Sequence, residues 1–451
     1  MKVFRVILAT VIFVPVLLFF IDFADILPDS TSNLLRIQLA PAIFDGAVIV
    51  LTVYFLLTLL FGRIYCSIVC PAGILQDIFN RISCIGKKKK NGIMRFRAHK
   101  PSNLLRYIIL SVTSILAVVG FAELCLLLDP YSNFWRIGAN IFRPVAIWIN
   151  NGLANVLTSM GNYSLYNVSF SISVWALATA ILAFVVFAVM VYFRGRLFCN
   201  TICPVGALLS IVSRYSLFRI VIDRNTCNKC SSCERTCKAE AIDSREMDVD
   251  ASRCVSCFNC ISSCNKKAIN YRFAPKMLSK SDKEGVSKSR RSFLAVGATI
   301  VGTAPLMALG QEKDTRSGGS VPVTPPGSLS VERFKDICTG CHLCVVQCPS
   351  HVLQPAGLKY GLGFMLKPYM SYKDSFCNFS CTVCSEICPT GAIKPLTVEE
   401  KKTTQIGIAN FYIERCIVNT EENDCGACSE HCPTQAVHMV PYKGTLTIPH
   451  V

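Results

Sequence analysis

The densest motif in the chain reads Cys227-x2-Cys230-x2-Cys233-x3-Cys237 and, sixteen residues later, Cys254-x2-Cys257-x2-Cys260-x3-Cys264. Three cysteines at this spacing can bind one iron–sulfur cube, and the fourth, four residues further on, binds the neighbouring cube. We therefore predict two [4Fe-4S] clusters in one small domain. Their ligands are Cys227, Cys230, Cys233 and Cys264 for one cluster, and Cys254, Cys257, Cys260 and Cys237 for the other.

The two runs resemble a bacterial two-cluster ferredoxin. The Ala-Ile pairs at 241–242 and 268–269 are as in that family, whereas Lys238 and Asn265 stand where a proline usually follows the last cysteine. Structural zinc favours paired knuckles with a longer gap, and disulfides need an oxidising compartment. Both alternatives fit two triple runs poorly.

Long apolar segments indicate a membrane protein: hydrophobic residues make up 52% of the chain and the mean hydropathy is +0.44. Each segment has roughly 20 residues, enough for a hydrocarbon core of roughly 30 Å. We predict four spans, at 6–21, 43–61, 104–128 and 170–193. Lys2, Arg5 and the basic loop 63–103, with Asp77 as its single acid, place the N-terminus and this loop in the cytoplasm.

The formal net charge of +17 invites a nucleic-acid partner. Cluster thiolates are anionic but were counted as neutral, and many of the bases lie in the loops that membrane topology makes cytoplasmic. We therefore predict no nucleic-acid partner.

An internal repeat closes each pair of spans. Residues 62–73 match residues 195–206 at an offset of 133, and both copies contain Gly-Arg, then Cys-x3-Cys-Pro, then a second glycine. The repeat predicts two similar halves with their cysteine pairs side by side. We predict a redox or metal site at the inner membrane face from Cys66, Cys70, Cys199 and Cys203. A thiol–disulfide couple, or a helix cap with incidental cysteines, are the alternatives.

A second feature is Ser-Arg-Arg-Ser-Phe-Leu at 289–294, followed by apolar residues to Gly310. It resembles a twin-arginine export signal, which suits a cluster module that is assembled in the cytoplasm and must cross the membrane folded. Cleavage near 308–310 is one outcome, and retention of 293–310 as a fifth span is the one we favour.

The C-terminal part carries three more runs, each ending in Cys-Pro: Cys338-x2-Cys341-x2-Cys344-x3-Cys348, Cys377-x3-Cys381-x2-Cys384-x3-Cys388 and Cys416-x8-Cys425-x2-Cys428-x3-Cys432. The segment 338–342 also matches the haem attachment motif Cys-x2-Cys-His. The run continues at cluster spacing, however, so we predict clusters here as well.

The predicted architecture is a membrane all-α domain, with four spans in two similar halves plus a fifth anchor span, joined to two α+β ferredoxin-type modules. We divide the chain into a membrane domain (1–220), a cytoplasmic two-cluster ferredoxin (221–272), a linker with the twin-arginine motif (273–292), the fifth span or export signal (293–310), a second linker (311–330) and a periplasmic polyferredoxin (331–451).

The first 270 residues resemble the quinol-oxidising membrane component NapH, and the remainder resembles its exported partner NapG and the related MauM type. The paired Cys-x3-Cys-Pro motifs also occur in NosR and in the copper-reducing assembly protein CcoG. The resemblance implies [4Fe-4S] clusters, four to five in number, and a periplasmic pairing of the second run with the third. The implied sets are Cys377, Cys381, Cys384 with Cys432, and Cys416, Cys425, Cys428 with Cys388. The first run then lacks a partner: either Cys338, Cys341 and Cys344 take Cys348 as the fourth ligand, or the sequence is a truncated copy.

The function that we expect is electron transfer from the membrane quinone pool to a periplasmic oxidoreductase or cytochrome, without a substrate-converting site of its own. All six histidines lie outside the predicted spans, so a bis-histidine haem within the membrane is excluded. Glu123 and Asp129 are candidate proton acceptors for a bound quinone. The alternative is a copper reductase of the CcoG kind. The direction of electron flow cannot be predicted from the ligands.

Overall fold

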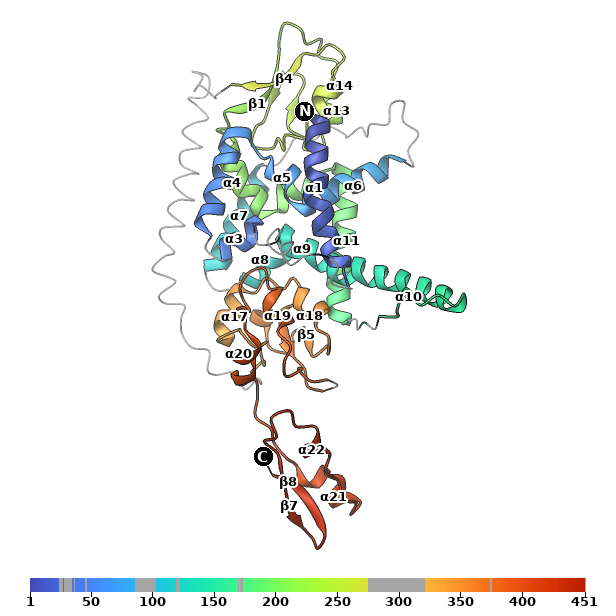
Figure 1. Ribbon diagram of the computed structural model, residues 1–451. Coiled ribbons are helices and arrows are strands. Elements are labelled where there is room, and N and C mark those ends of the chain that lie inside the picture. Colours follow the sequence, from blue (N-terminus) through green and yellow to red (C-terminus); the bar gives the residue numbers. More distant parts are fainter. Residues whose placement is uncertain are drawn as a thin grey trace.

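The structure, a computed structural model, describes residues 1–23, 27, 35, 37–44, 47–85, 103–118, 122–168, 170, 173–274, 321–373 and 375–450. The twin-arginine motif at 289–294 and the proposed fifth span at 293–310 lie outside the described residues. Figure 1 shows a bundle of helices in the middle, a ferredoxin-type domain at one end and the C-terminal modules at the other end.

Thirteen helices and helical turns form the described part of residues 1–213. The helices are α1 (Lys2–Ile21), α3 (Leu39–Phe44), α4 (Val48–Phe61), α5 (Tyr65–Ile68), α6 (Pro71–Ile85), α7 (Asn103–Val118), α8 (Ala122–Leu128), α9 (Pro130–Ile137), α10 (Arg143–Ser159), α11 (Val174–Arg194) and α12 (Pro204–Ser213), and the π-helical turn η2 (Gly138–Phe142) joins α9 to α10. A second π-helical turn, η3 (Phe198–Ile202), precedes α12.

Two of the helices are long and apolar enough to cross a membrane by length and composition, namely α1 and α11. The predicted span at 43–61 contains α4 and the end of α3, and the predicted span at 104–128 contains α8 and nearly all of α7, while residues 45–46 and 119–121 lie outside the described residues. Two of the four predicted spans thus coincide with a described helix long enough to cross a membrane, and the four-span arrangement stays a prediction.

Helix α9 lies across the bundle, and every one of its residues is buried. Its aromatic side chains pack on α1: the ring centroid of Trp135 lies 4.3 Å from that of Phe20, and Phe134 lies 5.7 Å from Phe13. These rings form the part of the core between the repeat and the C-terminal modules.

The ferredoxin-type domain contains β1 (Phe218–Ile222), α13 (Ser232–Thr236), β2 (Ile242–Asp243), β3 (Asp248–Val249), α14 (Asn259–Ser263) and β4 (Ile269–Phe273). Strand β1 pairs antiparallel with β4, and β2 pairs antiparallel with β3. The two short helices, each inside one cysteine run, pack against each other. The ferredoxin resemblance thus correctly predicted an α+β domain here.

The C-terminal part forms two modules. The first contains α17 (Val331–Ile337), α18 (Leu343–Gln347), β5 (Leu353–Pro355), η5 (Leu362–Phe364), β6 (Pro368–Met370), α19 (Val383–Glu386) and α20 (Val398–Thr403). The second, which we call the terminal module, contains η6 (Ile413–Arg415), α21 (Ile417–Thr420), α22 (Ala427–Glu430) and the hairpin of β7 (His438–Tyr442) and β8 (Leu446–His450). It lies beyond the first module, farthest from the helical bundle (Figure 1).

Candidate iron–sulfur and cysteine sites

The two copies of the repeat fold in similar ways. Gly62 ends α4 and Gly195 ends α11, with φ of 76° and 67°, a backbone conformation that glycine adopts without strain. A short helical segment then carries the first cysteine, and a proline begins the next helix, where its missing N–H costs nothing. A Cβ on Gly73 or Gly206 would lie 2.2 Å from the carbonyl oxygen of Cys66 or Cys199. Only glycine therefore permits this close approach in both copies.

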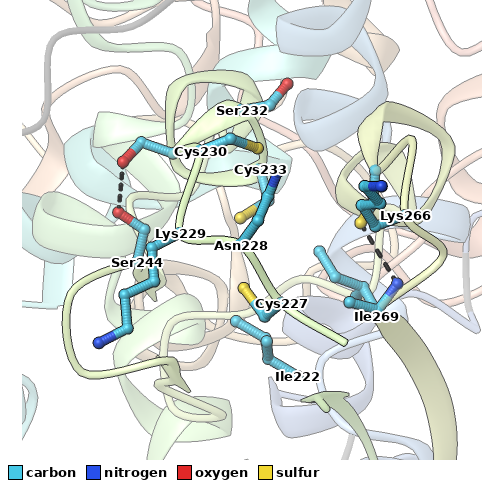
Figure 2. Close-up of a pocket in the computed structure, with 13 residues that line it drawn as sticks. Ile222, Cys227, Asn228, Lys229, Cys230, Ser232, Cys233, Ser244, Lys266 and Ile269 are labelled. Carbon is cyan, nitrogen blue, oxygen red and sulfur yellow. Dashed lines mark hydrogen bonds between the residues drawn. The ribbon is translucent and has the colours of Figure 1, made fainter. Parts of the chain in front are cut away.

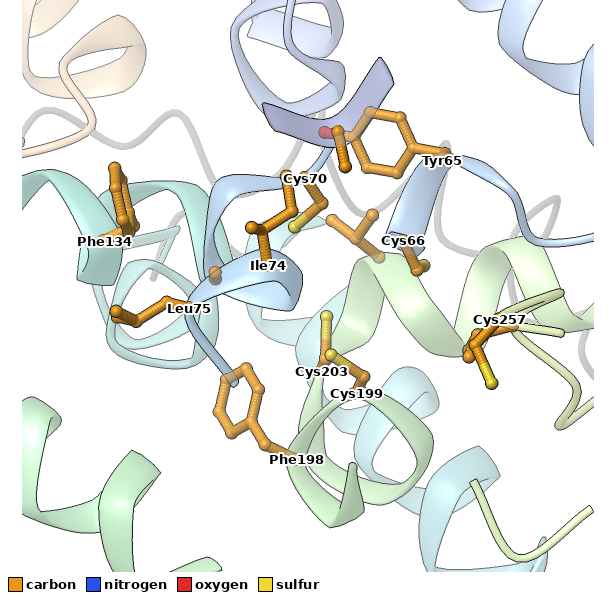
Figure 3. Packing of buried hydrophobic residues seen from close by; sticks show 14 of the residues in the cluster. Tyr65, Cys66, Cys70, Ile74, Leu75, Phe134, Phe198, Cys199, Cys203 and Cys257 are labelled. Atoms are coloured by element: carbon orange, nitrogen blue, oxygen red, sulfur yellow. The ribbon is translucent and has the colours of Figure 1, made fainter. Parts of the chain in front are cut away.

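The predicted redox or metal site is brought together by this fold. Figure 3 shows Cys70, Cys199 and Cys203 with their sulfurs near one another and Cys66 beside them, and each of the four residues is at most 4% exposed. They are free thiols, and burial together with the neighbouring thiols of Cys199, Cys66 and Cys70 raises the pKa of Cys203. The group, called the cysteine quartet below, consists of Cys66, Cys70, Cys199 and Cys203.

The repeat arginines cross from one copy to the other. Arg63 donates from Nη2 to the carbonyl oxygen of Cys199 at 2.9 Å and from Nη1 to Asn200 Oδ1 at 2.6 Å. Arg196 donates from Nη1 to the carbonyl oxygen of Cys66 at 2.7 Å and from Nη2 to that of Gly73 at 3.1 Å. Two buried guanidinium groups therefore flank the quartet and can offset the charge of thiolates.

The Asp77 carboxylate holds three cations around the quartet. It lies 2.8 Å from Arg196 Nη2, 2.6 Å from Lys238 Nζ and 3.2 Å from Arg5 Nη1. Although burial alone raises the pKa of Asp77, the cations Arg196, Lys238 and Arg5 together lower it well below its usual range. The carboxylate therefore joins α6, the second repeat, α1 and the ferredoxin-type domain.

Lys238 stands where the ferredoxin family usually has proline, and the structure gives the reason for this departure. Its ammonium group binds Asp77, and its carbonyl oxygen accepts from the backbone N–H of Arg196 at 2.8 Å. Asn200 Nδ2 donates to the carbonyl oxygen of Ala239 at 2.7 Å, and Arg194 pairs with Glu240 at 3.0 Å. The end of the first cysteine run is thus the surface that docks on the repeat.

The structure brings together the cysteines that were predicted for the two ferredoxin clusters. A pocket of about 400 Å³ is lined by the first predicted set (Figure 2), namely Cys227, Cys230, Cys233 and Cys264. Its other lining residues include Ile222 and Ile269, so the cavity is largely apolar. In the second set, burial and the neighbouring thiols of Cys257, Cys254 and Cys237 raise the pKa of Cys260.

The first C-terminal module groups its cysteines differently from the prediction. A pocket of about 330 Å³ is lined by Cys338, Cys341, Cys344 and Cys388. Burial and the thiols of Cys377, Cys381 and Cys348 raise the pKa of Cys384 to about 12. The first run therefore exchanges fourth cysteines with the second run, because α18 packs on α19 in the way that α13 packs on α14.

The observed grouping of these cysteines differs from the prediction at Cys348 and at Cys388. Cys348 does not complete the cluster set of its own run, and Cys388 lies with the first run, away from the run in the terminal module. The terminal module keeps its own four cysteines, Cys416, Cys425, Cys428 and Cys432. Cys432, which was predicted to join Cys377, Cys381 and Cys384, belongs to this separate module.

The first C-terminal module docks on α9, η2 and α10. His342 Nδ1 lies 3.2 Å from Asn140 Nδ2, and His342 Nε2 lies 3.0 Å from the carbonyl oxygen of Leu366. Arg143 donates to Gln347 Oε1 at 2.8 Å. Burial and the nearby Arg136 lower the pKa of His342 to about 3. The neutral imidazole therefore donates from Nε2 and accepts at Nδ1, which makes it a link between the module and the helical bundle.

The two candidate residues for a quinone site, Asp129 and Glu123, lie at the start of α9 and in α8. Asp129 caps α9, since its Oδ2 accepts from both the N–H and the hydroxyl of Ser132 at 2.8 Å. Glu123 belongs to α8, but its side chain lies outside the described part of the structure. The bonds of Asp129 are those of a buried helix cap.

Sequence reasoning missed Arg63, Arg196, Asp77 and Lys238 as parts of the site. The signals were present: both arginines stand in the repeat, Asp77 is the single acid of a basic loop, and Lys238 departs from the ferredoxin pattern. Their roles depend on contacts with side chains that are far away in the sequence, and the sequence alone does not show these contacts.

Comparison with known proteins identifies the cysteine-bearing segments. Residues 44–92 and 175–224, the two repeat copies, match a family described as a 4Fe-4S binding domain. Residues 337–392 and 250–352 each match a family described as a 4Fe-4S dicluster domain. The chain contains 4Fe-4S ferredoxin-type domains. The match over 337–392 ends before the terminal module and contains the two runs that the structure pairs.

Several curated proteins are similar to parts of the chain. The uncharacterized protein MJ0749 of Methanocaldococcus jannaschii is 39% identical over 77 residues, which are 17% of this chain and 30% of that protein. The methylamine utilization ferredoxin-type protein MauM of Methylobacillus flagellatus is 29% identical over 169 residues, 36% of this chain and 69% of that protein. The regulatory protein NosR of Pseudomonas aeruginosa is 26% identical over 192 residues, 41% of this chain and 21% of that protein.

No solved structure matches the chain. The resemblance to the MauM type and to NosR is confirmed to this extent, and the fusion of a NapH-like with a NapG-like part stays a prediction.

Replacing Asp77 with Asn leaves three buried cations without their counter-charge. We expect the variant to be less stable by roughly 3–5 kcal/mol, measured as thermal unfolding of the purified protein. The matched control is Glu399→Gln, which removes an exposed pair with Lys402 and costs at most about 1 kcal/mol. Because the pKa of Asp77 is lowered, its contribution is present above about pH 3.9 and lost as the pH falls further. Equal stability of the two variants would contradict this role.

Replacing Cys388 with Ser tests the observed grouping of the first C-terminal module. We expect the electron paramagnetic resonance signal of the cluster bound by Cys338, Cys341 and Cys344 to change, and Cys348→Ser to change the signal of the other cluster in the module. Cys432→Ser is the control, because the predicted grouping assigned it to the second run. The predicted grouping would be correct if Cys432→Ser altered the signal of the cluster bound by Cys377, Cys381 and Cys384 and Cys348→Ser left that signal unchanged.

Proposed function

We propose that this protein carries electrons from quinol in the cytoplasmic membrane to an acceptor on its outer side. The single observation that carries the proposal is the buried cysteine quartet (Figure 3). The elements α5 and α6, which carry or adjoin its first two cysteines, lie between the ferredoxin-type domain and the C-terminal modules (Figure 1). Cysteine sites therefore occur at both ends of the helical bundle and at its centre. The acceptor is a periplasmic oxidoreductase or cytochrome.

A membrane location is supported by the surface of the bundle. Helices α1 and α11 are long and apolar enough to span, and they expose large apolar side chains such as Phe4, Leu182 and Phe193. In a bilayer these side chains would be covered by lipid. The basic loop 63–103 puts the ferredoxin-type end in the cytoplasm, which leaves the opposite end for the C-terminal modules and agrees with the twin-arginine motif.

Helix α10 supports the same placement. It projects sideways from the end of the bundle that carries the C-terminal modules (Figure 1). Exposed apolar side chains follow its length at helical spacing, namely Val145, Trp148, Ile149, Leu153, Val156 and Met160. Its asparagines on another face bond to the loop 166–168, for example Asn150 Nδ2 to the carbonyl oxygen of Tyr166 at 3.0 Å. This pattern suits a helix that lies in the membrane interface.

Two of the cysteine sets fit iron–sulfur clusters directly, because the pocket lined by Cys227, Cys230, Cys233 and Cys264 and the pocket lined by Cys338, Cys341, Cys344 and Cys388 each combine four thiols with largely apolar walls. When bound, the clusters supply one-electron redox chemistry at potentials that the protein surroundings tune. We propose five ferredoxin-type sites: the two predicted sets at the cytoplasmic end, Cys338, Cys341, Cys344 with Cys388, Cys377, Cys381, Cys384 with Cys348, and Cys416, Cys425, Cys428 with Cys432. The N–H groups and short helices of each run hold the thiols in place.

We propose that the quartet holds one further cluster, shared by the two repeat copies. Its four thiols are buried, and Arg63 and Arg196 supply positive charge beside them. The amide N–H of Gly206 donates to Cys203 Sγ at 3.2 Å, which stabilises negative charge on that sulfur. Asp77 and Lys238 fix the distance between this site and the ferredoxin-type domain.

Quinol oxidation releases two protons with its two electrons, so it needs a proton acceptor. Asp129 and Glu123 remain the proposed groups, at the end of the bundle that faces the C-terminal modules. Burial raises the pKa of Asp129, although the N–H and hydroxyl of Ser132 lower it in part. A raised pKa favours the uptake of a proton by this carboxylate.

Anaerobic addition of a menaquinol analogue to the purified, oxidised protein tests the proposal. We expect the visible cluster absorption to bleach, and we expect only part of the bleaching in the double variant Cys66→Ser with Cys199→Ser, because the quartet links the two ends. Cys125→Ser is the matched control, since this cysteine lies outside every run and bonds to the carbonyl oxygen of Thr113. If quinol leaves the clusters oxidised while Cu(II) reoxidises reduced ones, the protein is a copper reductase instead.

Trp148 tests the membrane placement of α10, because its side chain is 74% exposed. In vesicles that contain lipids brominated near the headgroup, we expect its fluorescence to be quenched. The wild type is compared with Trp148→Phe, and the difference in quenched fluorescence between the two proteins is the contribution of Trp148. Buried Trp135 should contribute little to the quenching. Equal quenching in both proteins would place α10 outside the interface.

A further inference from the structure

The cysteine quartet is nearly symmetric, and one polar residue breaks its symmetry. At the repeat offset of 133, Gln76 of α6 corresponds to Leu209 of α12. Both side chains are buried, at 1% and 0% exposure. The first copy therefore presents a side-chain amide where the second copy presents a methyl group.

Three of the four sulfurs have an N–H donor. Arg63 Nη2 lies 3.8 Å from Cys66 Sγ, and the backbone N–H of Gly206 donates to Cys203 Sγ at 3.2 Å. The backbone N–H of Gly73 bonds to Cys70 in the same way. Hydrogen bonds of this kind stabilise a thiolate that binds metal.

Cys199 lacks the arginine contact that its counterpart Cys66 has, and Asp77 explains the difference. The Asp77 carboxylate binds Arg196 through Nε at 2.9 Å and through Nη2 at 2.8 Å. At the corresponding position the second copy has Ser210, whose hydroxyl donates to the carbonyl oxygen of Ala207. In the described part of the chain Arg63 contacts no carboxylate and reaches the sulfur of Cys66, whereas Arg196 is bound by Asp77.

Gln76 occupies the place beside Cys199. The Cys199 thiol donates to Gln76 Oε1 at 3.4 Å, and Gln76 Nε2 is buried with no hydrogen-bond partner among the described residues. This arrangement suits a protonated thiol only, because a cysteine that binds iron is a thiolate and has no proton to donate. Rotation of the amide by half a turn places an N–H at the sulfur, in the position that the oxygen occupies.

We propose that Gln76 donates a hydrogen bond to the sulfur of Cys199 when the quartet holds its cluster, and that this bond raises the reduction potential of the cluster. The inference rests on the proposed function, which places a cluster in the quartet. Gln76 is then a positioning and tuning residue. It supplies the fourth N–H donor in the one place where the arginine of the repeat is bound elsewhere.

The test compares Gln76→Leu, the residue of the second copy, with Gln76→Glu, whose carboxylate accepts but does not donate when ionised. Redox titration of the purified full-length protein is monitored by electron paramagnetic resonance. The quartet signal is identified as the one lost in Cys66→Ser. We expect both variants to keep the wild-type iron and sulfide content and to shift the midpoint potential of the quartet signal downward, leaving the ferredoxin signals in place.

Asn80→Leu, one turn further along α6, is the matched control, and we expect no shift of the quartet potential in it. An unchanged potential in both Gln76 variants overturns the role of Gln76 and leaves the cluster in the quartet intact. Equal iron content in the wild type and in Cys66→Ser overturns the proposed cluster itself, and the role of Gln76 with it. A third outcome is that Gln76→Leu loses the iron of the quartet while Gln76→Glu keeps the wild-type iron content and potential. In that case Gln76 only fills space, and the tuning role is likewise overturned.

Discussion

The contact of Asp77 with Arg196, Lys238 and Arg5 is the constraint on which the rest of the structure depends. One carboxylate joins the first repeat copy, the second copy, the N-terminal helix and the ferredoxin-type domain. Three cations around one acid leave an excess of positive charge in a buried place. The thiols of the quartet lie next to this charge, and they are the groups on which negative charge would form if they bind metal.

This arrangement gives the two halves of the protein a common centre. The ferredoxin-type domain docks through the end of its first cysteine run, while the first C-terminal module docks through His342 on the far side of α9. The buried aromatic rings of α1 and α9 fill the space between the quartet and that module. The order of the sites along the molecule is therefore set by docking surfaces that are part of the cysteine motifs themselves.

The sequence alone predicted local cysteine sets well and tertiary pairings less well. Three ligands within seven residues, such as Cys227, Cys230 and Cys233, are fixed by spacing, because the chain between them is too short to choose another partner. The fourth cysteine depends on which run packs beside it, so spacing could not show that Cys388 joins the first C-terminal run. Hydropathy likewise found the apolar segments at 43–61 and 104–128, but a hydropathy average over a window does not show where a helix such as α4 or α7 begins and ends.

Electron transfer across the membrane is the central claim, and proteoliposomes test it most directly. Ferricyanide is trapped inside vesicles that expose the ferredoxin-type domain outward, and a membrane-impermeant reductant is added outside. The account predicts that the wild type reduces the trapped ferricyanide, and that Cys66→Ser with Cys199→Ser does so far more slowly while both end modules keep their clusters. Equal rates in the two proteins would contradict a path through the quartet.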